Sequence, residues 1–134
     1  MRYLLDVNAL IAYGITDHPF HIRVSLRANS LTGQASEFAT SSITELGFVR
    51  IISQVSAYGV NLEKARDLIL QVKQTSPVKF SFIHDDHDMT HLPPWVKTAK
   101  HTTDGHLAQL AKSNGAILAT LDENIPGSFI IPGK

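Results

Sequence analysis

Short apolar runs alternate with helical stripes along most of this chain. The runs typical of strands are residues 2–5, 38–41, 79–83, 116–121 and 129–131. The segments typical of helices are residues 8–13, 17–28, 42–55, 62–74 and 103–113. Strands and helices that alternate in this way predict an α/β domain with three layers, α/β/α, around a mainly parallel sheet.

The chain offers no place to divide it into several domains. Its 134 residues contain no internal repeat and no linker rich in Pro, Gly or Ser. A length of this order is usual for one domain with its own hydrophobic core. We therefore expect residues 1–134 to form a single domain.

Composition limits the chemistry that the chain can perform. It contains no cysteine, which excludes a disulfide framework, a thiolate zinc site and a cysteine nucleophile. Twelve basic residues balance twelve acidic ones, so a nucleic-acid substrate would need a local basic patch. Asp6 and Asn8 interrupt the first apolar run, which therefore does not resemble a signal peptide. We expect a cytoplasmic protein.

Four acidic residues occupy equivalent places in the predicted alternation. Asp6 follows the first strand, Glu45 lies in the first turn of a helix, Asp104 begins a helix, and Asp122 follows the strand that starts at Ala116. Ligands of parallel sheets bind outside the carboxyl ends of the strands, so these side chains are expected to converge. Close carboxylates repel one another unless a cation compensates them. The pattern predicts a site for Mg²⁺ or Mn²⁺ and phosphodiester hydrolysis.

Each acid also has a simpler interpretation when it is taken alone. Asp6 would cap the next helix, and Glu45 would form a Ser-x-x-Glu capping box with Ser42. Asp104 would be a favourable charge at a helix amino terminus, and Asp122 a turn residue. The four positions together favour the metal site.

Four motifs make the chain similar to the PIN-domain ribonucleases, in the group of VapC-type toxins. They are LLDVNALIA at residues 4–12, TELGFVRI at 44–51, TTDGHLAQLA at 102–111 and LATLD at 118–122. The resemblance covers nearly the whole length and implies the metal ligands Asp6, Glu45, Asp104 and Asp122. It also implies support for these ligands from Asn8, Thr103 and Thr120.

The resemblance carries further expectations about fold and function. It implies strand order 3-2-1-4-5 and a Mg²⁺- or Mn²⁺-dependent endoribonuclease that acts on RNA. As a toxin of a toxin–antitoxin pair, the protein would bind a cognate antitoxin and form a homodimer. The alternatives are a housekeeping RNA-processing PIN nuclease and a catalytically inactive PIN-like module that binds RNA or protein. A phosphatase is less consistent, because Asn8 stands where that pattern requires a second acid.

The sequence HDDHDMTH at residues 84–91 raises the possibility of a zinc site. His84, His87 and His91 are spaced as ligands on a helix would be. Pro93 and Pro94 follow closely and favour a connecting segment over a helix. We interpret the segment as a solvated loop.

Two departures from the family pattern and one basic group remain. Gly105 and His106 follow the third acid in place of the expected small and aromatic residues, and the segment before Glu45 lacks an expected tryptophan. We interpret His106 as an exposed helix residue without a role. Lys97, Lys100 and His101 precede Asp104, where positive charge would suit an RNA backbone. A solvated face is the simpler interpretation of these three residues.

Overall fold

A computed structural model describes residues 1–133 and contains one five-stranded parallel sheet. The strand order is β3-β2-β1-β4-β5, which confirms the predicted order and fold class. The strands are β1 (Arg2–Leu5), β2 (Glu37–Ser41), β3 (Phe80–Ile83), β4 (Ala116–Thr120) and β5 (Phe129–Ile130).

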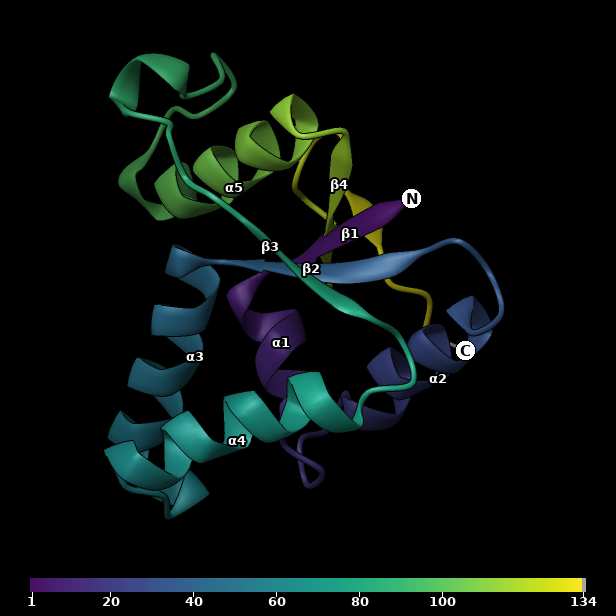
Figure 1. Cartoon of the computed structure of the whole chain (residues 1–134). Coiled ribbons are helices and arrows are strands. Elements are labelled where there is room, and N and C mark those ends of the chain that lie inside the picture. The colour runs from purple at the N-terminus through teal and green to yellow at the C-terminus, as the bar shows by residue number, and fades with distance from the viewer. Residues whose placement is uncertain (134) are drawn as a thin grey trace.

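Helices cover both faces of this sheet, so the domain has the three predicted layers (Figure 1). The α-helices are α1 (Val7–Gly14), α2 (His21–Leu31), α3 (Ser42–Gln54), α4 (Leu62–Thr75) and α5 (Thr102–Ser113). Short 3-10 turns are η1 (Ser56–Tyr58), η2 (Met89–His91) and η3 (Ala99–His101). None of the helices in residues 1–133 is long and apolar enough to cross a membrane.

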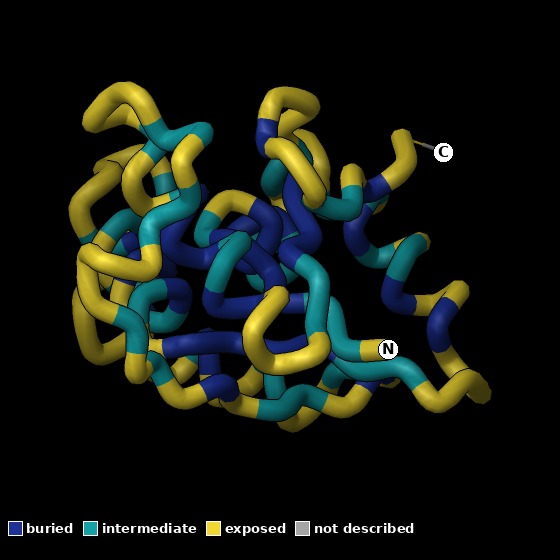
Figure 2. The backbone as a smooth tube through the Cα atoms, turned by 90° about the horizontal axis from the view of Figure 1, so that it is seen from above, coloured by how far each residue is buried: buried dark blue, intermediate teal, exposed yellow. Residues whose placement is uncertain are grey.

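Two hydrophobic cores lie on opposite faces of the sheet. Side chains alternate between the faces of a strand, and in β1 Leu5 belongs to the core under α1 to α4 while Leu4 belongs to the core under α5. In the same way Phe38 and Ala39 of β2 face opposite cores. Figure 2 shows the buried stretches of the backbone in the interior of the molecule, with exposed stretches around them. Burial on both faces explains why the strands are apolar runs without alternation.

Most helix boundaries agree with the sequence analysis, with one clear exception. The side chain of Asn61 accepts a hydrogen bond from the backbone N–H of Lys64 and caps α4, as expected. The second helix begins at His21 and not near Asp17 or Pro19, and no side chain caps it. Residues 15–20 instead form turns, held by backbone hydrogen bonds such as the one that His18 N–H donates to the carbonyl of Ile15.

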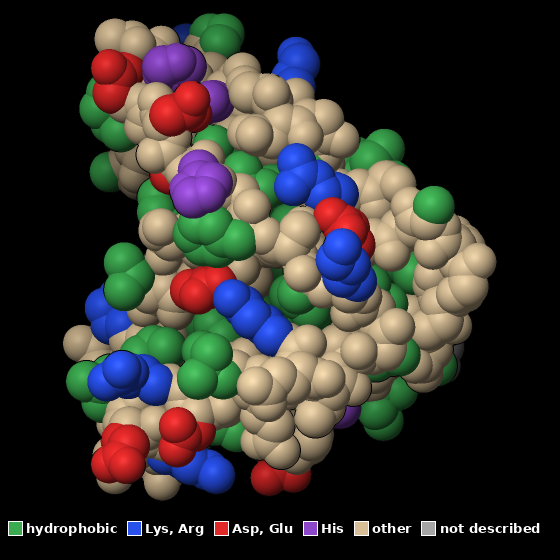
Figure 3. Space-filling model, viewed as in Figure 1, with side chains coloured by type: hydrophobic (Ala, Val, Ile, Leu, Met, Phe, Trp, Pro, Cys, Tyr) green, Lys and Arg blue, Asp and Glu red, His purple; other side chains and the backbone are tan. Residues whose placement is uncertain are grey.

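Parallel pairing brings the carboxyl ends of the strands to one edge of the sheet. Leu4 pairs with Ala39 in β2 and with Leu118 in β4, so the three central strands end almost level. In Figure 1 this edge faces left, with α3 below it and the start of α5 above it. Figure 3 shows the surface hollowed on the same side. Asp6, Glu45 and Asp122 follow these strand ends, and Asp104 lies in the first turn of α5.

Candidate functional site

Asp6 is the most deeply buried of the four predicted acids, with 6% of its surface exposed. Its backbone N–H continues the β1–β4 pairing by donating to the carbonyl of Ala119. Its Oδ1 accepts from the N–H of Ala9 at 2.8 Å and caps α1, while its Oδ2 accepts from Thr120 Oγ1 at 2.5 Å. Burial raises the pKa of Asp6 from 3.8 to about 6, against the lowering effect of these two hydrogen bonds.

Two further aspartates contribute to the same electrostatic environment. The charges of Asp104 and Asp122 both raise the pKa of Asp6. Burial raises the pKa of Asp104, Asp122 raises it further, and His101, whose Nδ1 lies 3.9 Å from Asp104 Oδ2, lowers it. Neighbouring carboxylates, from the start of α5 and the turn after β4, therefore oppose the ionisation of Asp6, which follows β1.

Thr120 connects two members of this aspartate group. It is fully buried, donates its hydroxyl proton to Asp6 and accepts the backbone N–H of Asp122 at 3.0 Å. Asp122 is exposed, and its Oδ1 accepts from the N–H of Asn124, so it is also a turn residue. Thr120 thus contacts both aspartates, and its support of metal ligands stays a prediction.

Glu45 is engaged by a different set of partners from those of the aspartates. Its Oε2 accepts from Thr40 Oγ1 at 2.5 Å and forms a close ion pair with the ammonium group of Lys73 on α4. Glu45 is not among the charges that raise the pKa of Asp6 or Asp104. The helix that carries it still packs beside α1, because a Cβ on Gly47 would lie 2.7 Å from Val7 Cγ2.

The simpler interpretation of Glu45 as part of a capping box is wrong. Ser41, one residue before Ser42, caps α3 and exchanges hydrogen bonds with Thr44. The polar groups at this helix end are therefore satisfied without Glu45. The carboxylate of Glu45 is free of a capping role.

The structure does not bring all the predicted residues together. As the side chains lie in residues 1–133, no three histidine or acidic side chains are grouped closely enough to hold one metal ion. Asn8 and Thr103 are both exposed, and neither side chain makes a hydrogen bond within that range. Their predicted support of the metal ligands stays a prediction.

Sequence analysis missed Thr40 and Lys73. Thr40 is fully buried near the end of β2, and a hydroxyl there could have been noticed as a polar residue inside an apolar strand. Lys73 lies 28 positions after Glu45. Lys73 belongs to none of the four sequence motifs. It reaches Glu45 only because α4 packs on α3.

His106 is buried, which contradicts its interpretation as an exposed helix residue. It is 7% exposed, and its Nε2 lies 2.5 Å from Asp85 Oδ2. Partial burial raises the pKa of Asp85, but the hydrogen bonds from His106 and from the backbone of His87 lower it overall. Gly105 is required beside it, because a Cβ there would lie 2.2 Å from Val96 Cγ2.

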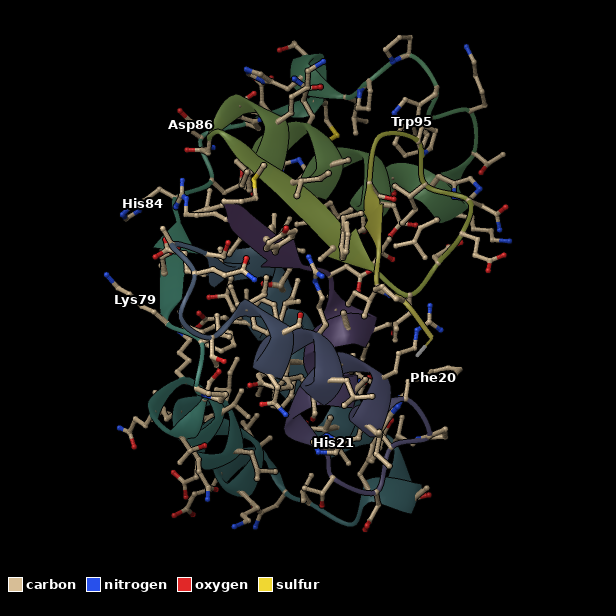
Figure 4. The ribbon with its side chains drawn as sticks, turned by 90° about the vertical axis from the view of Figure 1, so that its right-hand side faces the viewer. Phe20, His21, Lys79, His84, Asp86 and Trp95 are labelled. Carbon is tan, nitrogen blue, oxygen red and sulfur yellow. The ribbon has the colours of Figure 1, made fainter. Side chains whose placement is uncertain are left out.

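The histidines after β3 are only partly solvated. The ring of His87 stacks on that of His91 with centroids 4.2 Å apart, and His87 Nδ1 is buried without a hydrogen-bond partner in residues 1–133. His84 instead contacts Phe82, and Figure 4 shows His84 and Asp86 at the outer edge of the segment. The three histidines predicted as alternative zinc ligands therefore do not share one centre.

Comparison with known proteins identifies the family. The model of the PIN domain family matches residues 3–127. Among curated relatives, ribonuclease VapC38 of Mycobacterium tuberculosis is 30% identical over 91% of this chain and 86% of the relative. Ribonuclease VapC44 of the same organism is 33% identical over 93% and 89%.

A solved structure supports the fold independently. The crystal structure of VapBC2 from Rickettsia felis, bound to a DNA fragment from their promoter, matches with a TM-score of 0.64. The match is 15% identical and covers 97% of both chains. The family match, the curated relatives and the sheet order agree, and the chain belongs to the PIN-domain family, among the VapC-type ribonucleases.

Proposed function

We propose that this protein is a divalent-metal-dependent endoribonuclease and the toxin of a toxin–antitoxin pair. The observation that carries the proposal is the buried carboxylate of Asp6, whose pKa is raised to about 6 by burial and by the charges of Asp104 and Asp122. Such an arrangement is unfavourable at neutral pH unless a cation joins it. The curated relatives named as ribonucleases support the same activity.

The donor set fits Mg²⁺ or Mn²⁺. All candidate ligands are carboxylate oxygens, which hard cations prefer, and the chain has no thiolate that would favour a softer metal. Asp6, Asp104 and Asp122 would hold the ion, and Glu45 would join them after a change of side-chain orientation. When bound, such an ion activates water and stabilises charge on a phosphodiester.

The protein side chains have separate tasks in this mechanism. Thr120 and the N–H of Ala9 fix both oxygens of Asp6, so that this carboxylate is oriented before any ligand arrives. Lys97 and Lys100 are exposed just before α5, the helix that carries Asp104, and would contact the RNA backbone. A cytoplasmic location is part of the same proposal.

An antitoxin and a second copy of the chain are the proposed protein partners. The VapBC2 complex supports the antitoxin, which would place a basic side chain against the acidic site and neutralise it. The homodimer rests on the family resemblance alone. Size-exclusion chromatography with light scattering measures it directly.

RNA cleavage under controlled metal conditions tests the proposal. Purified protein is expected to cleave single-stranded or looped RNA in Mg²⁺ or Mn²⁺, to stop in EDTA and to resume when metal is restored. The Asp6→Asn variant serves as the matched control for a contaminating nuclease. Cleavage that persists in EDTA, or that survives in this variant, contradicts the proposed mechanism.

A further inference from the structure

Lys73 pairs with the carboxylate of Glu45, the fourth candidate ligand of the proposed metal site. Its ammonium group pairs with Glu45 Oε2, the same oxygen that accepts the hydroxyl of Thr40. The two charged side chains are 28% and 27% exposed, so the pair is partly withdrawn from water. One oxygen of Glu45 thus already has two donors, one of them a cation.

This pairing separates Glu45 from the other candidate ligands. In residues 1–133, Asp6, Asp104 and Asp122 form no ion pair with a lysine or arginine, and Asp104 has only the distant contact with His101. Glu45 alone among the four has a basic partner on a neighbouring helix. The acid that already has a cation is also the one whose charge does not contribute to the raised pKa values of Asp6 and Asp104.

We propose that Lys73 is a positioning residue that keeps Glu45 against α4 and competes with the divalent cation for its carboxylate. The inference rests on the proposed function, because it concerns the same metal site. Coordination of the ion through Glu45 Oε2 requires this oxygen to leave the ammonium group of Lys73. The protein therefore carries an internal competitor that weakens its own metal affinity.

The size of the effect follows from the exposure of the pair. Ion pairs that are partly open to water shift an equilibrium by up to about fivefold. Removal of Lys73 is therefore expected to tighten metal binding by about twofold to fivefold. A lysine suits this role, since its single point charge on a flexible stem releases a partner more readily than the two-pronged group of arginine.

Calorimetric titration of the metal-free protein with MnCl₂ measures this competition without any RNA. Lys73→Met is expected to lower the Mn²⁺ dissociation constant by the factor given above, whereas Lys73→Arg, which releases the carboxylate less readily, is expected to show no tightening. Lys64→Met is the matched control, because Lys64 lies exposed on the same helix and its side chain forms no ion pair in residues 1–133.

A double-mutant cycle separates displacement of Glu45 from a general field effect of the lost charge. In a Glu45→Gln background, Lys73→Met is expected to leave the dissociation constant unchanged, because there is no carboxylate to release. Equal tightening in both backgrounds overturns the inference. So does a Lys73→Met protein that folds normally by circular dichroism and binds Mn²⁺ no more tightly than wild type.

The same titration distinguishes this inference from the proposed function. Wild-type protein that binds Mn²⁺, with Asp6→Asn binding it far more weakly, supports the metal site whatever Lys73 does. Wild-type protein that binds no Mn²⁺ overturns both. Only the comparison of Lys73→Met with Lys64→Met decides the role of Lys73.

Discussion

Three aspartates and one glutamate at the same edge of the sheet differ in how their negative charge is compensated. The charges of Asp104 and Asp122 raise the pKa of Asp6, and that of Asp122 raises the pKa of Asp104. Within residues 1–133 these three aspartates have no basic partner except for the distant His101. Glu45, one helix away, is paired with Lys73 and Thr40. The first group needs a cation from solution, whereas the second already has one from the protein.

The difference teaches where binding energy for a metal arises. Relief of repulsion among the aspartates favours the ion, because the metal-free state stores unfavourable charge. Separation of Glu45 from Lys73 opposes it, because an existing ion pair must be broken. Metal affinity in this protein should reflect the balance of these two effects: loss of an aspartate should weaken metal binding, and loss of Lys73 should tighten it.

The largest expected effect is the loss of RNA cleavage in Asp6→Asn. The amide still accepts the N–H of Ala9 and keeps the cap of α1, but it is a poor ligand for a hard cation. Cleavage in saturating Mg²⁺ should fall by about 100-fold or more. Circular dichroism checks that the fold is retained. A variant with wild-type turnover would remove Asp6 from the site.

Glu45→Gln is expected to reduce cleavage by a similar factor of about 100-fold, from the other side of the comparison. Stability should change little, because α3 is capped by Ser41 and Thr44 and the lost ion pair is partly exposed. Melting temperature and RNA cleavage are measured on one preparation. Near-normal cleavage by a normally folded variant would mean that the catalytic site contains only the aspartates.

The raised pKa of Asp6 predicts a pH dependence of stability in EDTA. A carboxyl group with a raised pKa in the folded state stabilises most at low pH, and that contribution is lost as pH rises through about 6. Between pH 5 and pH 8, wild type should lose about 1.4 kcal/mol relative to Asp6→Asn. Urea unfolding of both proteins measures this difference. If the stabilities of the two proteins changed with pH in the same way, the pKa of Asp6 would not be raised by burial in solution.

The smallest expected effect is the stabilisation of the metal-free protein by Asp104→Asn. This change removes one of the charges that oppose Asp6 and should raise the melting temperature by roughly 2 °C, since less than 1 kcal/mol is involved for a half-exposed group. Added Mg²⁺ should then stabilise wild type more than the variant, by mass action. Equal Mg²⁺ shifts in the two proteins would exclude Asp104 as a ligand.

Much of the fold was accessible from local sequence patterns. Apolar runs such as residues 116–120 are buried on both faces, and the stripe on residues 62–75 packs one face of α4, so their element types follow from periodicity. The start of α2 was predicted wrongly, because Asp17 and Pro19 resemble helix-start signals but form turns that only their packing selects. The position of Asp6 at a strand end was also readable.

Contacts between distant segments escaped the sequence analysis for a physical reason. His106 is buried beside Asp85, which lies in the segment after β3. The sequence around a histidine does not indicate whether such a distant partner covers it. The state of Glu45 depends on Lys73, which only the packing of α3 on α4 supplies. Local propensity and motif spacing carry no information on such partners.

The sequence by itself determined the α/β class, the alternation of elements and the four acids, because strand burial and helix periodicity are local properties of the chain. Tertiary structure alone decided how those acids are charged and paired. Parallel pairing of β1 and β4 brings Asp6 beside Thr120, and the packing of α4 on α3 brings Lys73 into contact with Glu45. The electrostatic environment of a carboxylate depends on all of its neighbours in space. For this reason Asp6, Asp104 and Asp122 have no lysine or arginine partner in residues 1–133, whereas Glu45 is paired with Lys73.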